Sequence, residues 1–192
     1  MEVLGILFSL IFVTPLVAFA FVSIYWGRTR DRDRLATAWG AYARRRGLTF
    51  GAPVGDWPNR TKPTVQWTEN GDAYRIEAHG GETTVSTRVI GRPSIAFMGE
   101  LVVARRGNEG VGPGETQPLD HRLVVRAHPA ELAERVLTND VKRALLGFDP
   151  QTLFYRHGEV CLAWPGGEEN DARLDEASAV VRRVLGALAA TQ

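Results

Sequence analysis

The chain has 192 residues, with 23 Lys and Arg against 22 Asp and Glu, and a single cysteine. A net charge of +1 is too balanced for a general nucleic-acid-binding domain, which is normally strongly basic, so we expect no nucleic-acid partner. One cysteine excludes an internal disulfide framework and any metal site that needs several cysteines. The roughly 160 residues that follow an apolar N-terminal segment suffice for one domain with its own core.

The first 26 residues predict a membrane anchor. Val3–Trp26 contains no charged side chain, and a helix of that length would measure about 36 Å, which exceeds the roughly 30 Å of a hydrocarbon core. Tyr25 and Trp26 lie where aromatic side chains favour the membrane interface. The alternative is a signal peptide cleaved after Ala20, but the segment lacks the basic start of such peptides. We therefore expect residues 1–26 to form an uncleaved transmembrane helix.

A basic juxtamembrane segment, residues 27–34, follows the predicted anchor. Positive residues beside a span stay in the cytoplasm, so we expect a single-pass inner-membrane protein with a cytoplasmic C-terminal domain. These arginines would set the topology; binding to anionic lipid headgroups, at ~1 kcal/mol per residue, is a second role they could have. The side chains predicted at the membrane interface are Tyr25, Trp26, Arg28, Arg30, Arg32 and Arg34.

The predicted domain, residues 35–192, begins with an amphipathic helix. Apolar residues recur at helical spacing through Leu35–Arg46, with Asp33 as the expected N-cap and Gly47 as the expected end. Its terminal arginines complement the helix dipole, which we favour over a nucleic-acid-binding patch. Gly51–Pro63, rich in Pro and Gly, predicts a loop.

The clearest local signal is a hairpin. Asn70-Gly71 favours a two-residue type I′ turn, and the register that follows places Trp67 opposite Tyr74 and Val65 opposite Ile76. One face of this hairpin is then apolar and the other polar, which is typical of a sheet with one solvated side.

A second hairpin is predicted at Gly80-Gly81, with Val85 opposite Ile76. Beyond it, alternating apolar residues predict a strand over residues 95–103, with Gly99 as a bend. The expected C-terminal elements are a glycine-rich loop (Arg106–Pro118), a strand (Leu119–Ala127), a helix after Pro129, a short helix ending at Gly147, a hairpin (Thr152–Trp164) and a final helix capped by Asn170 or Asp171.

These elements predict the α+β class: an N-terminal transmembrane helix, then a mainly antiparallel sheet of about six or seven strands packed with three or four helices. The pattern of residues in two segments resembles that of uncharacterised bacterial single-span membrane proteins. The residues that carry this resemblance are Trp39, Tyr42, Ala43, Gly47, Leu48, Phe50, Leu137, Thr138, Val141 and Leu145. The resemblance implies no catalytic residue.

Catalytic motifs are absent from the sequence: it has no nucleophile elbow, no phosphate-binding loop and no metalloprotease motif. His121 and His128 are seven residues apart on one predicted strand, so they would point to opposite faces. Cys161 falls opposite Phe154 in its hairpin, which favours a buried, inert thiol. Trp57, in a Pro- and Gly-rich loop, is a possible partner-binding residue if it is exposed.

We therefore expect a non-enzymatic binding or scaffolding module that is held at the lipid bilayer, needs no cofactor or metal, and has a protein partner. The alternative is a cell-envelope enzyme of unrecognised type whose domain lies outside the cytoplasm. That alternative needs the opposite topology or a cleaved signal peptide, and a polar cleft near His121 or the loop of residues 106–118.

Overall fold

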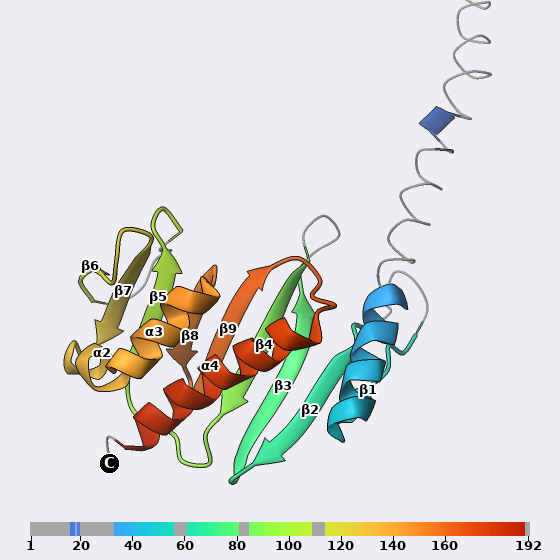
Figure 1. Ribbon diagram of the computed structural model, residues 1–192. Helices are drawn as coiled ribbons and strands as arrows, with labels where there is room; N and C mark the ends of the chain where they lie inside the picture. The colour runs from blue at the N-terminus through green and yellow to red at the C-terminus, as the bar shows by residue number, and fades with distance from the viewer. Residues whose placement is uncertain are drawn as a thin grey trace, which may run out of the picture.

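The computed structural model describes residues 16, 17, 19, 33–55, 61–80, 85–108 and 114–190. From residue 33 onward they form one nine-stranded antiparallel sheet with four helices, so the predicted α+β class is confirmed (Figure 1). The predicted transmembrane helix lies outside these residues, apart from Leu16, Val17 and Phe19. Within the described part of the chain, no helix is both long enough and apolar enough to cross a bilayer.

Nine strands replace the six or seven expected from the sequence. Their order in space is β1-β2-β3-β4-β9-β8-β5-β7-β6. The strands are β1 (Thr49–Gly51), β2 (Thr64–Glu69), β3 (Asp72–His79), β4 (Ser86–Arg92), β5 (Glu100–Arg105), β6 (Gln117–Pro118), β7 (Leu123–His128), β8 (Thr152–Arg156) and β9 (Glu159–Pro165). The strands that exceed the expectation, β1 and β6, lie at the two edges and are too short to show alternation in the sequence.

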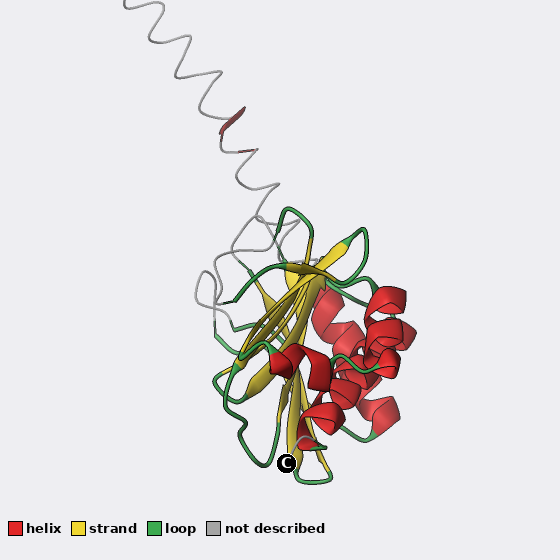
Figure 2. Ribbon diagram, turned by 90° about the vertical axis from the view of Figure 1, so that its left-hand side faces the viewer, coloured by secondary structure: helices red, strands yellow, loops and turns green. Residues whose placement is uncertain are grey.

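All four helices cover one face of the sheet (Figure 2). They are a helix over residues 33–46, α2 (Glu131–Val136), α3 (Asn139–Phe148) and α4 (Asp171–Ala189). The long α4 packs on β4 and β9, α3 packs on α4, and α2 packs on β7 and β5. The core lies between this layer and the sheet, and its largest fully buried side chains include Trp39, Tyr155 and Ile76.

The first hairpin has the predicted register, with Trp67 opposite Tyr74 and Val65 opposite Ile76. The predicted register of the second hairpin is wrong. β4 begins at Ser86, and Val89 lies opposite Ile76. Because the difference is four residues, the apolar side of β4 still faces the helices. Val85, however, is 40% exposed instead of buried.

Two other strands begin later than the sequence predicts. Residues 93–99 cross an edge of the sheet without strand structure, leaving Ile95 57% exposed, and β5 begins at Glu100. Gly99 makes the expected bend, with φ +121°, and an added Cβ would lie 2.7 Å from the His128 carbonyl oxygen. β7 begins at Leu123, after a turn in which Asp120 Oδ1 accepts the backbone N–H groups of Arg122 and Leu123.

Two helices, α3 and α4, begin at residues whose side chains cap them. Asn170 caps α4 by accepting the Ala172 N–H at 2.9 Å, and Thr138 caps α3. The apolar side chains along one side of α4, including Leu174, Val181 and Leu188, are buried. Asp33 is already helical in the structure, so it is not the N-cap that the sequence predicts.

Candidate interaction surface

The histidines do not form a site. His121 is in the turn before β7, not on the strand, so the prediction that it shares a strand with His128 is wrong. Its exposed ring lies 3.7 Å from an Asp120 carboxylate oxygen. His157 is in the β8–β9 turn, with φ 51°. Among the described residues, no three His, Cys, Asp or Glu side chains are grouped so as to hold a metal ion.

Cys161 is buried in the middle of the sheet, opposite Phe154 as predicted. Burial raises the pKa of its thiol to about 12, so the nucleophilic thiolate is a very minor species at neutral pH. No catalytic role for the thiol follows from this position.

We expect Cys161 to resist alkylation in the folded protein. At pH 8 the thiol lies far below its raised pKa and out of contact with solvent, so a thiol reagent should label it only after denaturation. The measurement is intact-mass spectrometry after iodoacetamide treatment, with and without urea. Rapid labelling of the native protein would show that β9 opens frequently.

Loops and helix ends gather along one edge of the sheet, called the upper edge here for its position in Figure 1. The strand registers place the ends of β3, β5 and β9 and the starts of β2, β4, β7 and β8 along it. The helix of residues 33–46 also begins there (Figure 1). The described side chains that define this edge are Arg34, Val54, Lys62, Val85, Arg105, Arg106, His121 and Arg122.

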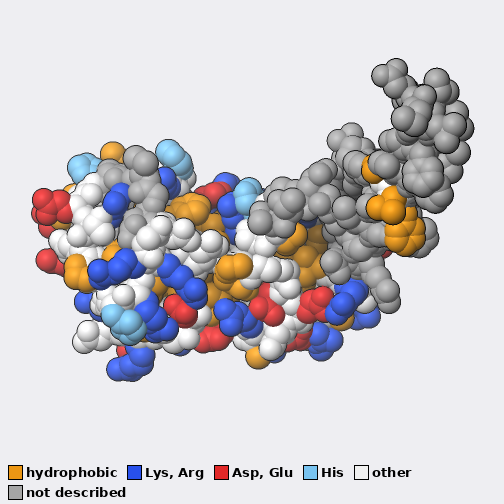
Figure 3. All heavy atoms as spheres, turned by 90° about the horizontal axis from the view of Figure 1, so that it is seen from above, with side chains coloured by type: hydrophobic (Ala, Val, Ile, Leu, Met, Phe, Trp, Pro, Cys, Tyr) orange, Lys and Arg blue, Asp and Glu red, His pale blue; other side chains and the backbone are white. Residues whose placement is uncertain are grey.

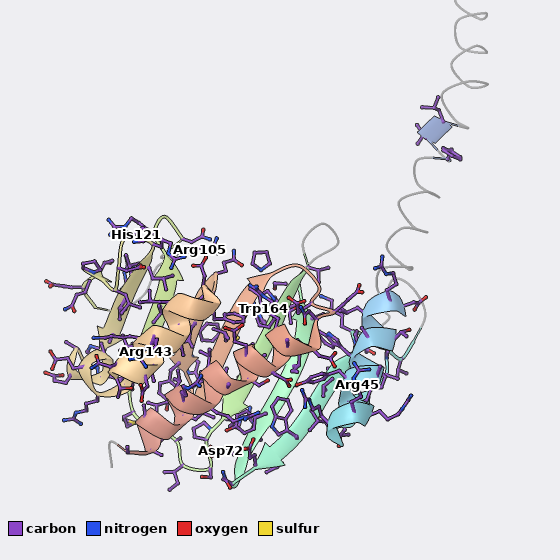
Figure 4. The ribbon with its side chains drawn as sticks, in the orientation of Figure 1. Arg45, Asp72, Arg105, His121, Arg143 and Trp164 are labelled. Atoms are coloured by element: carbon purple, nitrogen blue, oxygen red, sulfur yellow. The ribbon has the colours of Figure 1, made fainter. Side chains whose placement is uncertain are left out.

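Arginines gather at the corner of the upper edge that lies farthest from the helix of residues 33–46. Arg105 and His121 both lie at the top of the molecule in Figure 4, while Arg143 lies lower, on α3. Asp149 pairs with both Arg105, at 2.7 Å, and Arg122, at 3.6 Å. Arg106 is exposed beside them. Figure 3 looks onto this edge and shows Lys and Arg side chains interspersed with Asp and Glu, with hydrophobic side chains near the centre.

The helix of residues 33–46 is fixed to the start of α4 by polar contacts. The Trp39 Nε1–H donates to the Glu168 carbonyl oxygen at 2.7 Å, and the Tyr42 hydroxyl donates to Asp175 Oδ1 at 3.0 Å. Arg45 binds Asp171 through Nε and Nη2, at 2.9 and 2.7 Å. These contacts, with an Arg46–Asp175 ion pair, make the helix an integral part of the domain.

Burial and then the neighbouring Asp175 carboxylate raise the pKa of Tyr42 well above its usual value, so the hydroxyl stays a hydrogen-bond donor at physiological pH. We expect Tyr42→Phe to lower the free energy of unfolding by about 1 kcal/mol, since one hydrogen bond is lost and the ring remains. Urea denaturation followed by circular dichroism measures the change. Arg44→Gln, an exposed change on the same helix, is the control.

The predicted interface residues are only partly placed. Arg34 is exposed on the helix and pairs with Glu169 at 3.5 Å. Tyr25, Trp26, Arg28, Arg30, Arg32 and Trp57 lie outside the described residues. Sequence reasoning missed the carboxylates of α4 that receive Arg45 and Arg46. Their spacing, Asp171 and Asp175 at i and i+4, puts both on one helix face, but the sequence did not identify their partners.

The sheet face away from the helices is a second broad surface (Figure 2). Its charges are largely paired within the sheet: Arg75 with Glu77 at 3.0 Å and Arg156 with Glu100 at 3.0 Å, besides an Arg92–Glu159 pair. Each of these three arginines therefore has an oppositely charged neighbour within the sheet. The geometry of the first two ion pairs does not make hydrogen bonds, so the Nε atoms of Arg75 and Arg156, like that of Arg88, are buried without a hydrogen-bond acceptor among the described residues.

Comparison with known proteins gives one informative match. No protein-family model matches the chain, and no curated protein matches it. A solved structure is similar: the crystal structure of the mycobacterial trehalose monomycolate transport factor A, TtfA. The alignment covers 80% of this chain and 94% of TtfA, with a TM-score of 0.59 and 17% sequence identity. At that identity the likeness shows a shared fold.

Proposed function

We propose that this chain is a membrane-anchored, non-enzymatic accessory protein whose α+β domain binds a protein partner during transport of a cell-envelope lipid. The observation that carries the proposal is the fold that it shares with a transport factor over most of both chains. The scattered histidines and the buried Cys161 support a binding role, because none of them offers a nucleophile with an adjacent base.

The anchor in this proposal rests on the sequence. Val3–Trp26 is long enough and apolar enough to span a bilayer, and the arginines of residues 27–34 favour a cytoplasmic position for the domain. The resemblance to bacterial single-span proteins agrees with that arrangement. In this arrangement the helix of residues 33–46 transmits the position of the anchor to the domain, since it is hydrogen-bonded to the start of α4.

Purification from membranes tests the proposed partner. The full-length chain, affinity-tagged after Gln192, is extracted in mild detergent, and the proteins that copurify with it are identified by mass spectrometry. We expect a membrane-embedded lipid transporter in near-equal amount. Copurification should weaken with Trp39→Ala, which loosens the helix of residues 33–46 from α4. It should persist with Arg143→Gln, a substitution of an exposed side chain on α3. Recovery of the intact chain without any integral membrane protein would contradict the proposal.

Reporter fusions after Gln192 test the side of the membrane. A cytoplasmic domain should give a fluorescent green fluorescent protein fusion and an inactive alkaline phosphatase fusion. The opposite pair of results would place the domain outside the cytoplasm, and the chain would then belong with the alternative of a cell-envelope enzyme.

A further inference from the structure

We propose that the upper edge of the domain lies flat on an anionic bilayer surface, with Arg105, Arg106 and Arg122 against lipid headgroups at the corner farthest from the anchor. This inference rests on the anchor in the proposed function and goes further. It assigns a lipid-binding surface to residues that are more than 70 positions from the predicted span.

The short connection to the predicted anchor is the first argument. Six residues, 27–32, separate Trp26 from Asp33. A fully extended chain covers at most ~3.6 Å per residue, so Asp33 lies within about 25 Å of the end of the span. The helix that starts there begins at the upper edge (Figure 1). The end of the upper edge where this helix begins therefore lies within about 25 Å of the predicted span.

The rigid attachment of that helix is the second argument. The helix of residues 33–46 is bound to α4 through Trp39 and Tyr42, and Arg34 pairs with Glu169 just before α4. A domain fixed to its first helix in this way cannot rotate independently of it. The orientation of the first helix therefore sets the orientation of the whole sheet.

The charges decide whether the far corner also reaches the surface. Nine strands at ~4.8 Å spacing make an edge about 40 Å wide, so the corner at Arg105 could stand clear of the bilayer if the domain were tilted. Anionic lipids attract a basic residue near their surface by ~1 kcal/mol, and this corner carries three arginines against Asp120 and Asp149. The net positive charge of this corner therefore favours an orientation in which it contacts the anionic bilayer.

Exposed apolar side chains alone do not identify the surface. Val54 and Val85 are 70% and 40% exposed at the upper edge, but Ile95 and Met98 are 57% and 94% exposed at the opposite edge. The attachment point of the anchor and the arginine corner distinguish the two edges. The opposite edge therefore supplies the control position for the experiment.

Site-specific fluorescence in vesicles tests the orientation. The full chain carries a fluorophore on Asn108→Cys at the arginine corner or on Met98→Cys at the opposite edge; native Cys161 is buried and stays unlabelled. β5 separates these positions by six residues, or about 20 Å, which exceeds the short range of a headgroup nitroxide quencher. In phosphatidylcholine vesicles that contain phosphatidylglycerol, we expect several-fold stronger quenching at residue 108 than at residue 98.

Charge variants test the arginine contact. Arg106→Gln should lower the ratio of docked to undocked domain by roughly five-fold, and hence the quenching at residue 108, because one headgroup attraction of ~1 kcal/mol is lost. The control is Arg143→Gln on α3, away from the upper edge, where the side chain is 83% exposed. It should leave the quenching unchanged. Equal quenching with and without phosphatidylglycerol would overturn the role of the arginines.

Two failures are distinguishable by flotation of the same vesicles. If the chain floats with the lipid but residues 108 and 98 are quenched equally, the flat orientation is wrong and the anchor stands. If the chain does not float, the anchor itself is absent, and both the proposed function and this inference fail.

Discussion

Trp39→Ala is expected to lower the free energy of unfolding by about 3–5 kcal/mol, the cost of removing a large aromatic side chain from a packed core. Trp39 has no exposed surface, and its Nε1–H donates to the Glu168 carbonyl oxygen at 2.7 Å. Such a loss is a large fraction of the 5–15 kcal/mol that typically stabilises a domain. The measurement is urea denaturation of the full-length chain in mild detergent, followed by circular dichroism.

The size of this effect follows from what Trp39 joins. Glu168 also donates its backbone N–H to Thr87 Oγ1 at 2.9 Å, and its carboxylate accepts from Trp164 Nε1 at 3.3 Å. Through Glu168, the indole of Trp39 therefore connects the helix of residues 33–46, the first helix of the domain, to β4, to β9 and to the segment that precedes α4. Trp39→Phe is the matched control: most of the apolar contact remains, and we expect a loss of about 1–2 kcal/mol. If Trp39→Ala costs less than is expected for Trp39→Phe, the helix of residues 33–46 does not contribute to the stability of the domain.

Local signals in the sequence predicted the elements whose geometry is set locally. Asn70-Gly71 determines both the turn and the register of β2 and β3, since a two-residue type I′ turn allows one alignment. Gly80-Gly81 predicted such a turn wrongly. The last pair of that hairpin is His79 with Ser86, so the connection is longer than the glycine pair implies. Ser86 Oγ donates to the His79 carbonyl oxygen there, a bond that the sequence pattern does not reveal.

The contacts that matter for the proposed function depend on tertiary structure. Arg45 and Asp171 are 126 positions apart, and the sequence alone explained Arg45 by the dipole of its own helix. The edge strand β1 pairs with β2, and its Phe50 ring lies beside Gly40 of the helix of residues 33–46. A strand of three residues is too short to show alternation in the sequence. Arg105 and Arg122 meet at one corner only after β5 and β7 pair. The upper edge is therefore a product of the fold.

The same contacts connect stability to function. If the first helix is the link between the bilayer and the domain, each bond between that helix and α4 also restricts how the domain is oriented. Tyr42→Phe and Trp39→Ala should then both widen the range of orientations, in proportion to the stability that each removes. Quenching at residue 108 should decrease in the same order. If neither change alters the quenching, the contacts between the helix of residues 33–46 and α4 do not control the orientation of the domain.

The second large effect is expected at Gly91, a position on β4 that α4 covers. A Cβ on Gly91 would lie 2.6 Å from Val181 Cγ1 and 2.8 Å from Leu185 Cδ1, both shorter than van der Waals contact allows. Val181 and Leu185 are buried, so little free space is available to relieve the contact. Gly91→Ala should therefore cost about 1–3 kcal/mol through overpacking, and Gly91→Val more.

Gly186→Ala makes the same chemical change on α4 with the opposite expected sign. No atom lies within 4 Å of its added Cβ, and alanine favours the helical backbone by about 0.5–1 kcal/mol over glycine. Thermal unfolding of the two variants, followed by circular dichroism, should move the midpoint down for Gly91→Ala and up for Gly186→Ala. Because α4 also binds the first helix through Asp171 and Asp175, displacement of α4 at Gly91 should loosen that helix as well. A neutral Gly91→Ala would mean that α4 is not seated on β4 at this point.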